Sequence, residues 1–399
     1  MKNNAAWLFV ALISLTGCEV KIDSSNKIVG SGKSITEQRP VTAFTELENQ
    51  SFFDIVITKG DKDEVEITGD DNLVSQIETV VEGQRLVIRN KNKSFSFTWK
   101  NTPGTVKIKA AHLDSVDNSG SGDIELRGLE NDKFSLKSNS SGDIKAIGQV
   151  QSLNAIANGS GDLHLDQLSV AQADINMNSA GDVKMGKLSK LLNLKVNGSG
   201  DFLADHLQDA SVNLMLQGPG SAKLRGQVTE LKVDASGSGD LDVDGLKVAQ
   251  ATLQLYGPGD INLAGAADTL TITISGSGDV DAKDLHAKTV VLKNNGPANV
   301  SLNVDQNLNA EISGSGDLDA KLNAANKIEI VMNGPGASSL SGTADSLTAK
   351  INGSGDLHAR ELLLRIANIK VNGPSEAEVN VKQTNGARVV RIDRGGVVN

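Results

Sequence analysis

The residues with the clearest chemical potential are aspartates that close a recurring Gly-Ser-Gly-Asp tetrapeptide. A carboxylate in a glycine-rich turn can bind Ca²⁺, because hard oxygen ligands suit that ion. Calcium-binding β-rolls, however, repeat about every nine residues, whereas these turns recur every 18–20 residues and supply one aspartate each. We therefore expect the aspartate to accept a hydrogen bond from an N–H group of its turn, and we expect no metal site. The complete tetrapeptides assign this structural role to Gly122 and Asp123, Gly161 and Asp162, Gly200 and Asp201, Gly239 and Asp240, Gly278 and Asp279, Gly316 and Asp317, and Gly355 and Asp356.

A second group of carboxylates lies on one predicted strand. Asp240, Asp242 and Asp244 alternate along the chain, so their side chains would point outward together. Enzymes that cleave polysaccharides use such carboxylates as acids, bases or nucleophiles, beside a basic residue in pectate-lyase-like enzymes. Outward acidic residues on a repeated β structure are more often a solvated surface. Catalysis at this strand is therefore the alternative interpretation.

Cysteine and histidine chemistry has little support in the sequence. Cys18 is the only cysteine, so neither an intramolecular disulfide nor a cysteine zinc cluster can form. The five histidines show no paired spacing such as HxxxH, and the chain has no GxSxG, P-loop or HExxH motif. The sequence thus predicts no catalytic residues and no cofactor.

The N-terminus predicts export and lipidation. An apolar run over 5–15 is too short to span a bilayer and has the length of a signal-peptide core. It ends in Leu-Thr-Gly-Cys, which resembles the lipobox of bacterial lipoproteins. We therefore expect a lipoprotein signal peptide over 1–17, lipidation of Cys18, attachment to a membrane through that lipid, and a polar tether over 18–38. Glu19, where aspartate would favour the inner membrane, favours the outer membrane.

An internal repeat organises most of the chain. The tetrapeptide or a variant of it occurs fourteen times, and we call its last residue the corner position. Corner positions run from Asp123 to Glu376, which is 253 residues over 13 intervals, or 19.5 residues per interval. Ten of them are aspartate, and from Ser199 onward the middle residue of the tetrapeptide alternates between serine and proline. A fixed period of this length is typical of a solenoid.

Apolar residues flank each corner position with a period of two. The residue three positions after the corner and the residue seven positions before it are apolar in all fourteen repeats. This pattern predicts one short strand leaving the corner and one entering it. Parallel strands joined by crossovers are nearly always right-handed. The sequence therefore predicts an all-β, right-handed parallel β-helix of about 14 rungs of 18–20 residues, with corner glycines at positive φ.

The composition agrees with an elongated β protein. The 399 residues include 41 glycines but only 2 Trp, 1 Tyr and 8 Phe, whereas a large globular core would bury more rings. With 39 Lys+Arg against 49 Asp+Glu, the net charge of −10 disfavours binding to nucleic acid. Most aromatic residues precede the repeat. We therefore expect an irregular β region over 39–115, a repeat β-helix over 116–380 and a C-terminal cap over 381–399.

The chain resembles the GIN-domain family, whose members are described as auto-transporter adhesin head domains. The resemblance rests on the tetrapeptide ladder and on an N-terminal block, Arg39-Pro40-Val41 through Phe44, then FDIVI at 53–57 and Lys59-Gly60. It covers about 39–380, and this chain has extra rungs. The resemblance implies a Gram-negative envelope protein, often a lipoprotein, with a right-handed β-helix like that of pectate lyases but without their catalytic residues.

Together these observations predict a non-enzymatic, lipid-anchored envelope protein that presents a β-helical polar face, as an adhesin head would. Its partner would be an unidentified envelope, matrix or glycan ligand, and the sequence leaves homo-oligomers and the orientation toward periplasm or cell exterior open. The alternative is a polysaccharide lyase or hydrolase on the same scaffold. Such an enzyme would need outward carboxylates with a basic residue in a groove walled by long loops.

Overall fold

The computed structural model describes residues 27–92, 96–100, 103–383, 386–392 and 397–398. The predicted signal peptide and Cys18 lie outside these residues. Within them nearly the whole chain is β-strand, and the one helix, α1 (Asp71–Val74), has four residues. No helix in this part of the chain is long and apolar enough to cross a bilayer.

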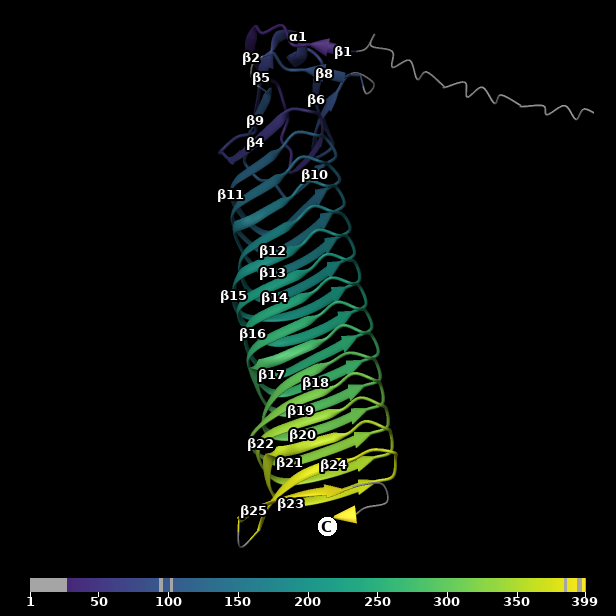
Figure 1. Ribbon diagram of the computed structural model, residues 1–399. Helices are drawn as coiled ribbons and strands as arrows, with labels where there is room; N and C mark the ends of the chain where they lie inside the picture. The colour runs from purple at the N-terminus through teal and green to yellow at the C-terminus, as the bar shows by residue number, and fades with distance from the viewer. Residues whose placement is uncertain (1–26, 93–95, 101–102, 384–385, 393–396, 399) are drawn as a thin grey trace, which may run out of the picture.

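Thirteen long parallel strands form the body of a β-helix (Figure 1), which confirms the predicted fold. Each strand has 13–15 residues. At about 4.8 Å per strand, the thirteen turns build a rod roughly 60 Å long. The strands are β11 (Ile124–Ser138), β12 (Ile144–Ala157), β13 (Leu163–Met177), β14 (Val183–Val196), β15 (Phe202–Leu216), β16 (Ala222–Ala235), β17 (Leu241–Leu255), β18 (Ile261–Ile274), β19 (Val280–Asn294), β20 (Val300–Ile312), β21 (Leu318–Met332), β22 (Ser338–Ile351) and β23 (Leu357–Val371).

The core is a continuous apolar column inside these turns. The predicted apolar positions are buried: Val243, three residues after a corner, is 2% exposed, and Leu253, seven residues before the next corner, is fully buried. Each turn alone has too little apolar surface to exclude water, so its stability comes from the turns above and below it.

Each turn consists of one long strand that bends, where the sequence predicted two short strands. The parallel register shifts at the bend, for example between Arg127 and Leu129. Six glycines with positive φ lie there, always five residues after a corner: Gly128, Gly148, Gly226, Gly245, Gly265 and Gly342. Hydrogen bonding between turns resumes directly after the bend, so the leaving strand and the entering strand merge.

The corner glycines do not have the positive φ that the sequence predicted. Their requirement is a close approach of backbone to backbone. A Cβ added to Gly239 would lie 2.0 Å from the carbonyl oxygen of Gly220, and one added to Gly278 would lie 1.9 Å from that of Gly259. At these two glycines the backbones of successive turns are in direct contact, with no room for a side chain between them.

Shorter strands close the N-terminal end of the rod (Figure 1). β4 and β10 extend the parallel stacking from β11 toward the N-terminal end, while β2, β5 and β9 pair antiparallel across that end. The described part of the predicted tether, 27–38, is therefore no linker, because it forms β1 and most of β2. The strands are β1 (Lys27–Val29), β2 (Ser34–Arg39), β3 (Glu46–Gln50), β4 (Asp54–Lys59), β5 (Glu64–Asp70), β6 (Ile77–Glu82), β7 (Arg85–Asn90), β8 (Ser96–Thr98), β9 (Thr105–Ala110) and β10 (Ser115–Asn118).

Aromatic rings fill the core at this end. Phe53 is fully buried and meets Trp99 edge to face, with ring centroids 5.0 Å apart. Phe52 stacks on Phe97 at 3.5 Å. These rings close the apolar column of the turns where it would otherwise meet water.

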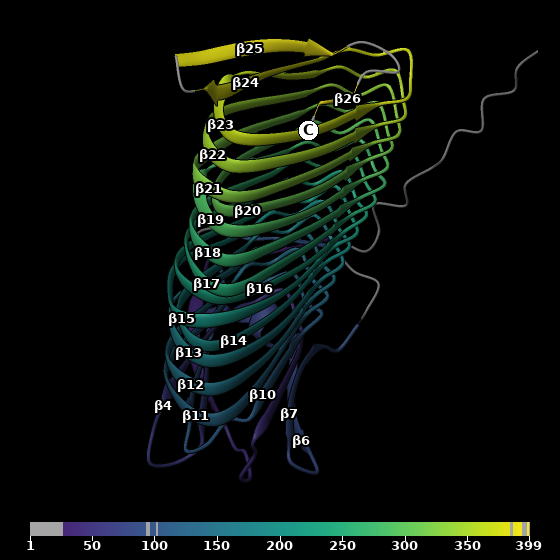
Figure 2. The same ribbon diagram turned by 90° about the horizontal axis from the view of Figure 1, so that it is seen from below.

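The parallel path ends after the fourteenth corner. β24 (Ala377–Gln383) still pairs parallel with β23, but β25 (Gly386–Ile392) turns back antiparallel to β24, and β26 (Val397–Val398) pairs antiparallel with β23. Figure 2 shows these three strands at the C-terminal end of the rod. Antiparallel strands at the end of a solenoid interrupt the parallel template that another chain could extend.

Candidate functional site

The corner positions form one row along an edge of the rod. The backbone N–H of a corner residue donates to the side-chain oxygen of the corner residue one turn earlier, as from Asp143 to Asp123 Oδ1 (2.8 Å) and from Asp260 to Asp240 Oδ1 (2.9 Å). The same bond recurs at each corner from Asp123 to Ala337 and again at Glu376, so these side-chain oxygens satisfy N–H groups at the turns. Each of these aspartates therefore accepts a hydrogen bond from the next turn, where the sequence predicted a bond within its own turn. We call this series of hydrogen bonds the ladder.

The corner residues that are not aspartate show which property of the side chain these hydrogen bonds between turns require. Ser221 Oγ accepts from the N–H of Asp240 at 3.1 Å, and Asn299 Oδ1 accepts from that of Asp317 at 3.1 Å. A neutral side-chain oxygen is therefore sufficient as the acceptor of this hydrogen bond. At the start of the row, partial burial raises the pKa of Asp54, an effect that the N–H of Asp123 opposes and the Asp123 carboxylate reinforces.

The ladder predicts unequal effects of two substitutions at Asp240. Asp240→Asn should leave stability nearly unchanged, because the amide oxygen can still accept from Asp260. Asp240→Ala should lower the free energy of unfolding by about 1 kcal/mol, since that N–H loses its acceptor. Chemical denaturation of both variants measures the difference.

A reciprocal variant controls this comparison. Ala337 has no side-chain oxygen to offer the next corner residue, Asp356, so Ala337→Asp should increase stability. Equal losses in Asp240→Asn and Asp240→Ala would instead show that the charge matters, as it would for a metal ligand. Among the residues with described positions, no group of three His, Cys, Asp or Glu side chains is arranged to hold a metal ion.

The row concentrates the charge of the protein. Ten aspartates and Glu376 place eleven negative charges at corner positions, which carry no lysine or arginine. The net charge of the whole chain is −10, so all other residues together sum to +1. The corner edge is therefore strongly acidic, whereas the rest of the chain as a whole is nearly balanced in charge.

Two outward faces flank this edge. We call the outward side chains four, six, eight and ten residues before each corner the pre-corner face, and those two and four residues after it the post-corner face. The register keeps each position aligned from turn to turn, as in the series Asp174, Asn193, Asn213 and Lys232.

Amide side chains form rows on the pre-corner face. Next to the corners, Asn158 Nδ2 donates to Asn139 Oδ1 at 2.8 Å, and Asn372 Nδ2 donates to Asn352 Oδ1 at 2.8 Å. These rows were not predicted from the sequence, although an asparagine precedes eight of the fourteen tetrapeptides. Such ladders fix the amides in place and orient their remaining N–H groups and lone pairs.

The pre-corner face also collects the exposed apolar side chains. In the described turns from β11 to β24, the large apolar residues that are exposed are Met215 (46%), Tyr256 (52%), Val291 (38%) and Ile366 (44%), and all four lie on this face. On the part of it over β12–β17 there is a hollow of about 620 Å³. One side of the rod is thus distinguished from the others by its composition.

Comparison with known protein families identifies the family of this chain. The sequence profile of the family described as "Putative auto-transporter adhesin, head GIN domain" matches residues 43–191, 188–264, 252–324 and 312–392. The chain belongs to this family. The predicted resemblance is therefore confirmed, and the four overlapping matches show that the repeat extends beyond one copy of the GIN-domain profile. Among curated proteins, none matches the chain.

Three solved structures similar to this GIN-domain chain come from Bacteroides and Parabacteroides species. A "putative adhesin" from Bacteroides fragilis is 17% identical, with a TM-score of 0.23, over 85% of this chain and 99% of that one. A "putative lipid binding protein" from Parabacteroides distasonis is 18% identical, with a TM-score of 0.25, over 83% and 99%. A "putative adhesin" from Parabacteroides merdae is 15% identical, with a TM-score of 0.29, over 88% and 98%.

The post-corner face of the GIN-domain rod holds the carboxylates of the enzymatic alternative. Asp242 and Asp244 line a shallow hollow of about 360 Å³ with Lys223 and Arg225. Asp240 is not part of it, because its carboxylate binds the N–H of the next corner. Asp242 itself accepts from Asn262 Nδ2 at 2.8 Å and lies 3.6 Å from Lys223 Nζ.

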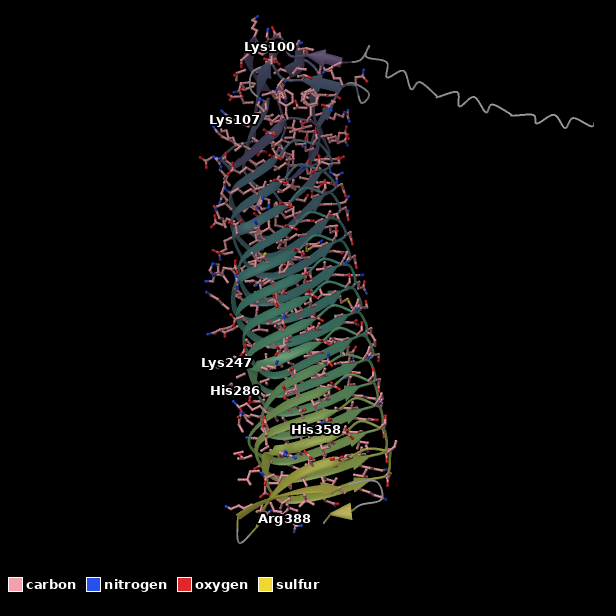
Figure 3. All side chains as sticks on the ribbon, viewed as in Figure 1. Lys100, Lys107, Lys247, His286, His358 and Arg388 are labelled. Atoms are coloured by element: carbon pink, nitrogen blue, oxygen red, sulfur yellow. The ribbon has the colours of Figure 1, made fainter. Side chains whose placement is uncertain are left out.

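The third side of the rod lies where the strands bend. Figure 3 shows Lys247 and His286 projecting from this edge. His286 Nδ1 lies 3.4 Å from Asp305 Oδ1, and Lys288 Nζ lies 2.6 Å from Asp268 Oδ1. Both contacts join neighbouring turns at the surface, where such exposed pairs contribute little to stability. Nothing on this side brings together the residues that the sequence singled out.

Proposed function

We propose that this GIN-domain chain is the non-enzymatic, adhesin-like head of a lipid-anchored envelope protein and that it binds its partner through the pre-corner face. The observation that carries the proposal is the concentration of exposed apolar side chains and ordered amide rows on this one face. Exposed apolar residues that gather on one surface, with polar groups around them, are typical of interaction sites.

The shape of the face suits adhesion. Its strands are hydrogen-bonded to neighbours on both sides along the rod, so the side chains are held on a rigid sheet. Because the same pattern of positions recurs on every turn, many weak contacts can form at once, and linked weak contacts give strong attachment. The family description as an adhesin head supports the same role.

We further propose that lipidation of Cys18 places the head at the outer membrane of a Gram-negative cell. The lipobox-like Leu-Thr-Gly-Cys sequence and Glu19 support this location. The lipid then serves as the membrane contact, and the rod presents its faces to an envelope, matrix or glycan partner.

The second candidate function is a polysaccharide-processing enzyme that uses the post-corner hollow. Its specific support is that Asp242, Asp244, Lys223 and Arg225 meet there. Against it, the turns beside this hollow are short corners, such as 236–240 and 256–260, so no long loop walls a substrate cleft. Asp242 is also held by Asn262 and Lys223 in the way of a surface ion pair.

Blocking one face at a time tests the proposal. The Cys18→Ser chain contains no other cysteine, so a single new cysteine can carry a polyethylene glycol polymer. Thr348→Cys places it on the pre-corner face and Ser339→Cys on the post-corner face of the same strand, β22, where both residues are exposed. We expect the polymer at 348 to reduce attachment to envelope, matrix or glycan surfaces several-fold, and the polymer at 339 to change it little.

Other results would overturn the proposal. Attachment lost only with the polymer at 339 would favour the post-corner hollow, and cleavage of a polysaccharide that stops in Asp242→Asn would favour the enzyme. An unmodified chain that attaches to none of these surfaces would contradict the adhesin-like role itself.

A further inference from the structure

We infer that the hollow of the pre-corner face over β12–β17 binds a neutral, extended oligosaccharide. The inference rests on the proposed function and names the ligand class for one part of the same face. Four properties of the hollow lead to it: its amides, its charge balance, its apolar floor and its spacing.

Five amide side chains line the hollow: Asn154, Asn176, Asn193, Asn213 and Gln254. An amide offers both a donor and an acceptor, as a sugar hydroxyl does, so the two groups are complementary. Some of the amides are already oriented: Asn213 Nδ2 donates to Asn193 Oδ1 at 2.9 Å, and Asn193 Nδ2 donates to Asp174 Oδ1 at 2.5 Å. A ligand therefore meets groups that need little further ordering.

The charges of the hollow favour a neutral ligand. Lys195 and Lys232 are balanced by Asp174 and Asp234, so the lining carries no net charge. The acidic row of corner positions runs along the edge of the same face. A polyanion such as a uronic-acid polymer would gain nothing from the lining and would be repelled by that row.

The floor contains apolar side chains among the amides. Met215 on β15 is 46% exposed, and Ile156 on β12 also lines the hollow. A pyranose ring has C–H faces as well as hydroxyl edges, so it can cover apolar atoms while its hydroxyls reach the amides. The flexible thioether of methionine adapts to such a surface.

The spacing favours a chain of sugars over a peptide. The hollow spans five intervals of about 4.8 Å between turns, or about 24 Å, and its groups recur at that interval. An extended glycan repeats on a similar scale and can meet several turns in succession. An extended peptide would instead seek a free strand edge, and β12–β17 are all paired on both sides.

Titration calorimetry with defined oligosaccharides tests the inference on the Cys18→Ser chain. The probes are neutral hexasaccharides of β-1,4-glucose, α-1,4-glucose and mannose, with a hexagalacturonate as the charged comparison. We expect a neutral probe to bind and the double variant Asn193→Ala, Asn213→Ala to bind it about tenfold more weakly, a loss of about 1.4 kcal/mol. Met215→Glu, at an exposed position, should weaken binding as well.

Asn309→Ala provides the matched control, because Asn309 occupies the same position of the repeat on β20, outside the hollow. Its binding should match that of the unsubstituted chain. Binding of the hexagalacturonate alone, or an equal loss in Asn309→Ala, would overturn the inference. If none of the oligosaccharides binds but the polymer at 348 still blocks attachment, the inference fails and the proposed function stands.

Discussion

Replacing Gly239 by alanine should lower the free energy of unfolding by about 3 kcal/mol or more, near the upper end for forced overpacking. The added Cβ would lie 2.0 Å from the oxygen and 2.6 Å from the carbon of the Gly220 carbonyl. Both are backbone atoms of the preceding turn, so neither can rotate away. Relief of the clash would separate two turns that are joined by the bond from Gly239 N–H to Gly218 O. Urea unfolding measures the loss.

Gly128→Ala is the matched control for this prediction. Gly128 has a φ of +75°, but an added Cβ would meet only Lys59 Cβ at an ordinary 3.7 Å. Its substitution should therefore cost only backbone strain, about 1 kcal/mol. If Gly128→Ala were as damaging as Gly239→Ala, backbone conformation rather than the contact between turns would explain the corner glycines.

Cys18→Ser should remove the protein from the membrane fraction almost completely. Stable anchoring requires acyl chains, and the cysteine sulfur is the point at which a lipobox sequence receives them. The variant should appear in the soluble or unprocessed fraction, with a mass that lacks the lipid. Cell fractionation followed by mass spectrometry measures both properties.

Glu19→Asp serves as the control, since it leaves the cysteine in place. It should keep the lipid and stay with a membrane, shifted toward the inner one if the aspartate signal operates. Unchanged membrane association and unchanged mass in Cys18→Ser would contradict the anchor.

The fold could be predicted from the sequence because the repeat and the apolar alternation are both strictly periodic. What a given glycine does within that period could not be predicted. Gly239 and Gly245 lie on the same turn, and an added Cβ would meet a carbonyl oxygen of the preceding turn at 2.0 Å and 2.2 Å respectively, but only Gly245 also has a positive φ, of +95°. That difference depends on how turns stack, and the periodic sequence contains the position of each glycine but no distance between turns.

The candidate site was only partly predictable for the same reason. Alternation correctly placed Asp242 and Asp244 on one outward face, but it also placed Asp240 with them, whose carboxylate instead binds the next turn. The hollow on the other face depends on how unlike side chains, such as Lys195 and Met215, lie side by side across turns. Such neighbours become visible only when the chain is wound into register.

Under the proposed adhesin-like role, the direction of the hydrogen bonds between turns has a mechanical consequence. These bonds run along the rod, so a pull on a bound face loads all the bonds between two turns together. A pull on the free end of the chain would break them one after another. Each turn of about 19.5 residues would then release about 65 Å of extended chain in place of about 4.8 Å of rod. Attachment through a face therefore keeps the rod stiff under tension, whereas force applied to a chain terminus would unfold it one turn at a time.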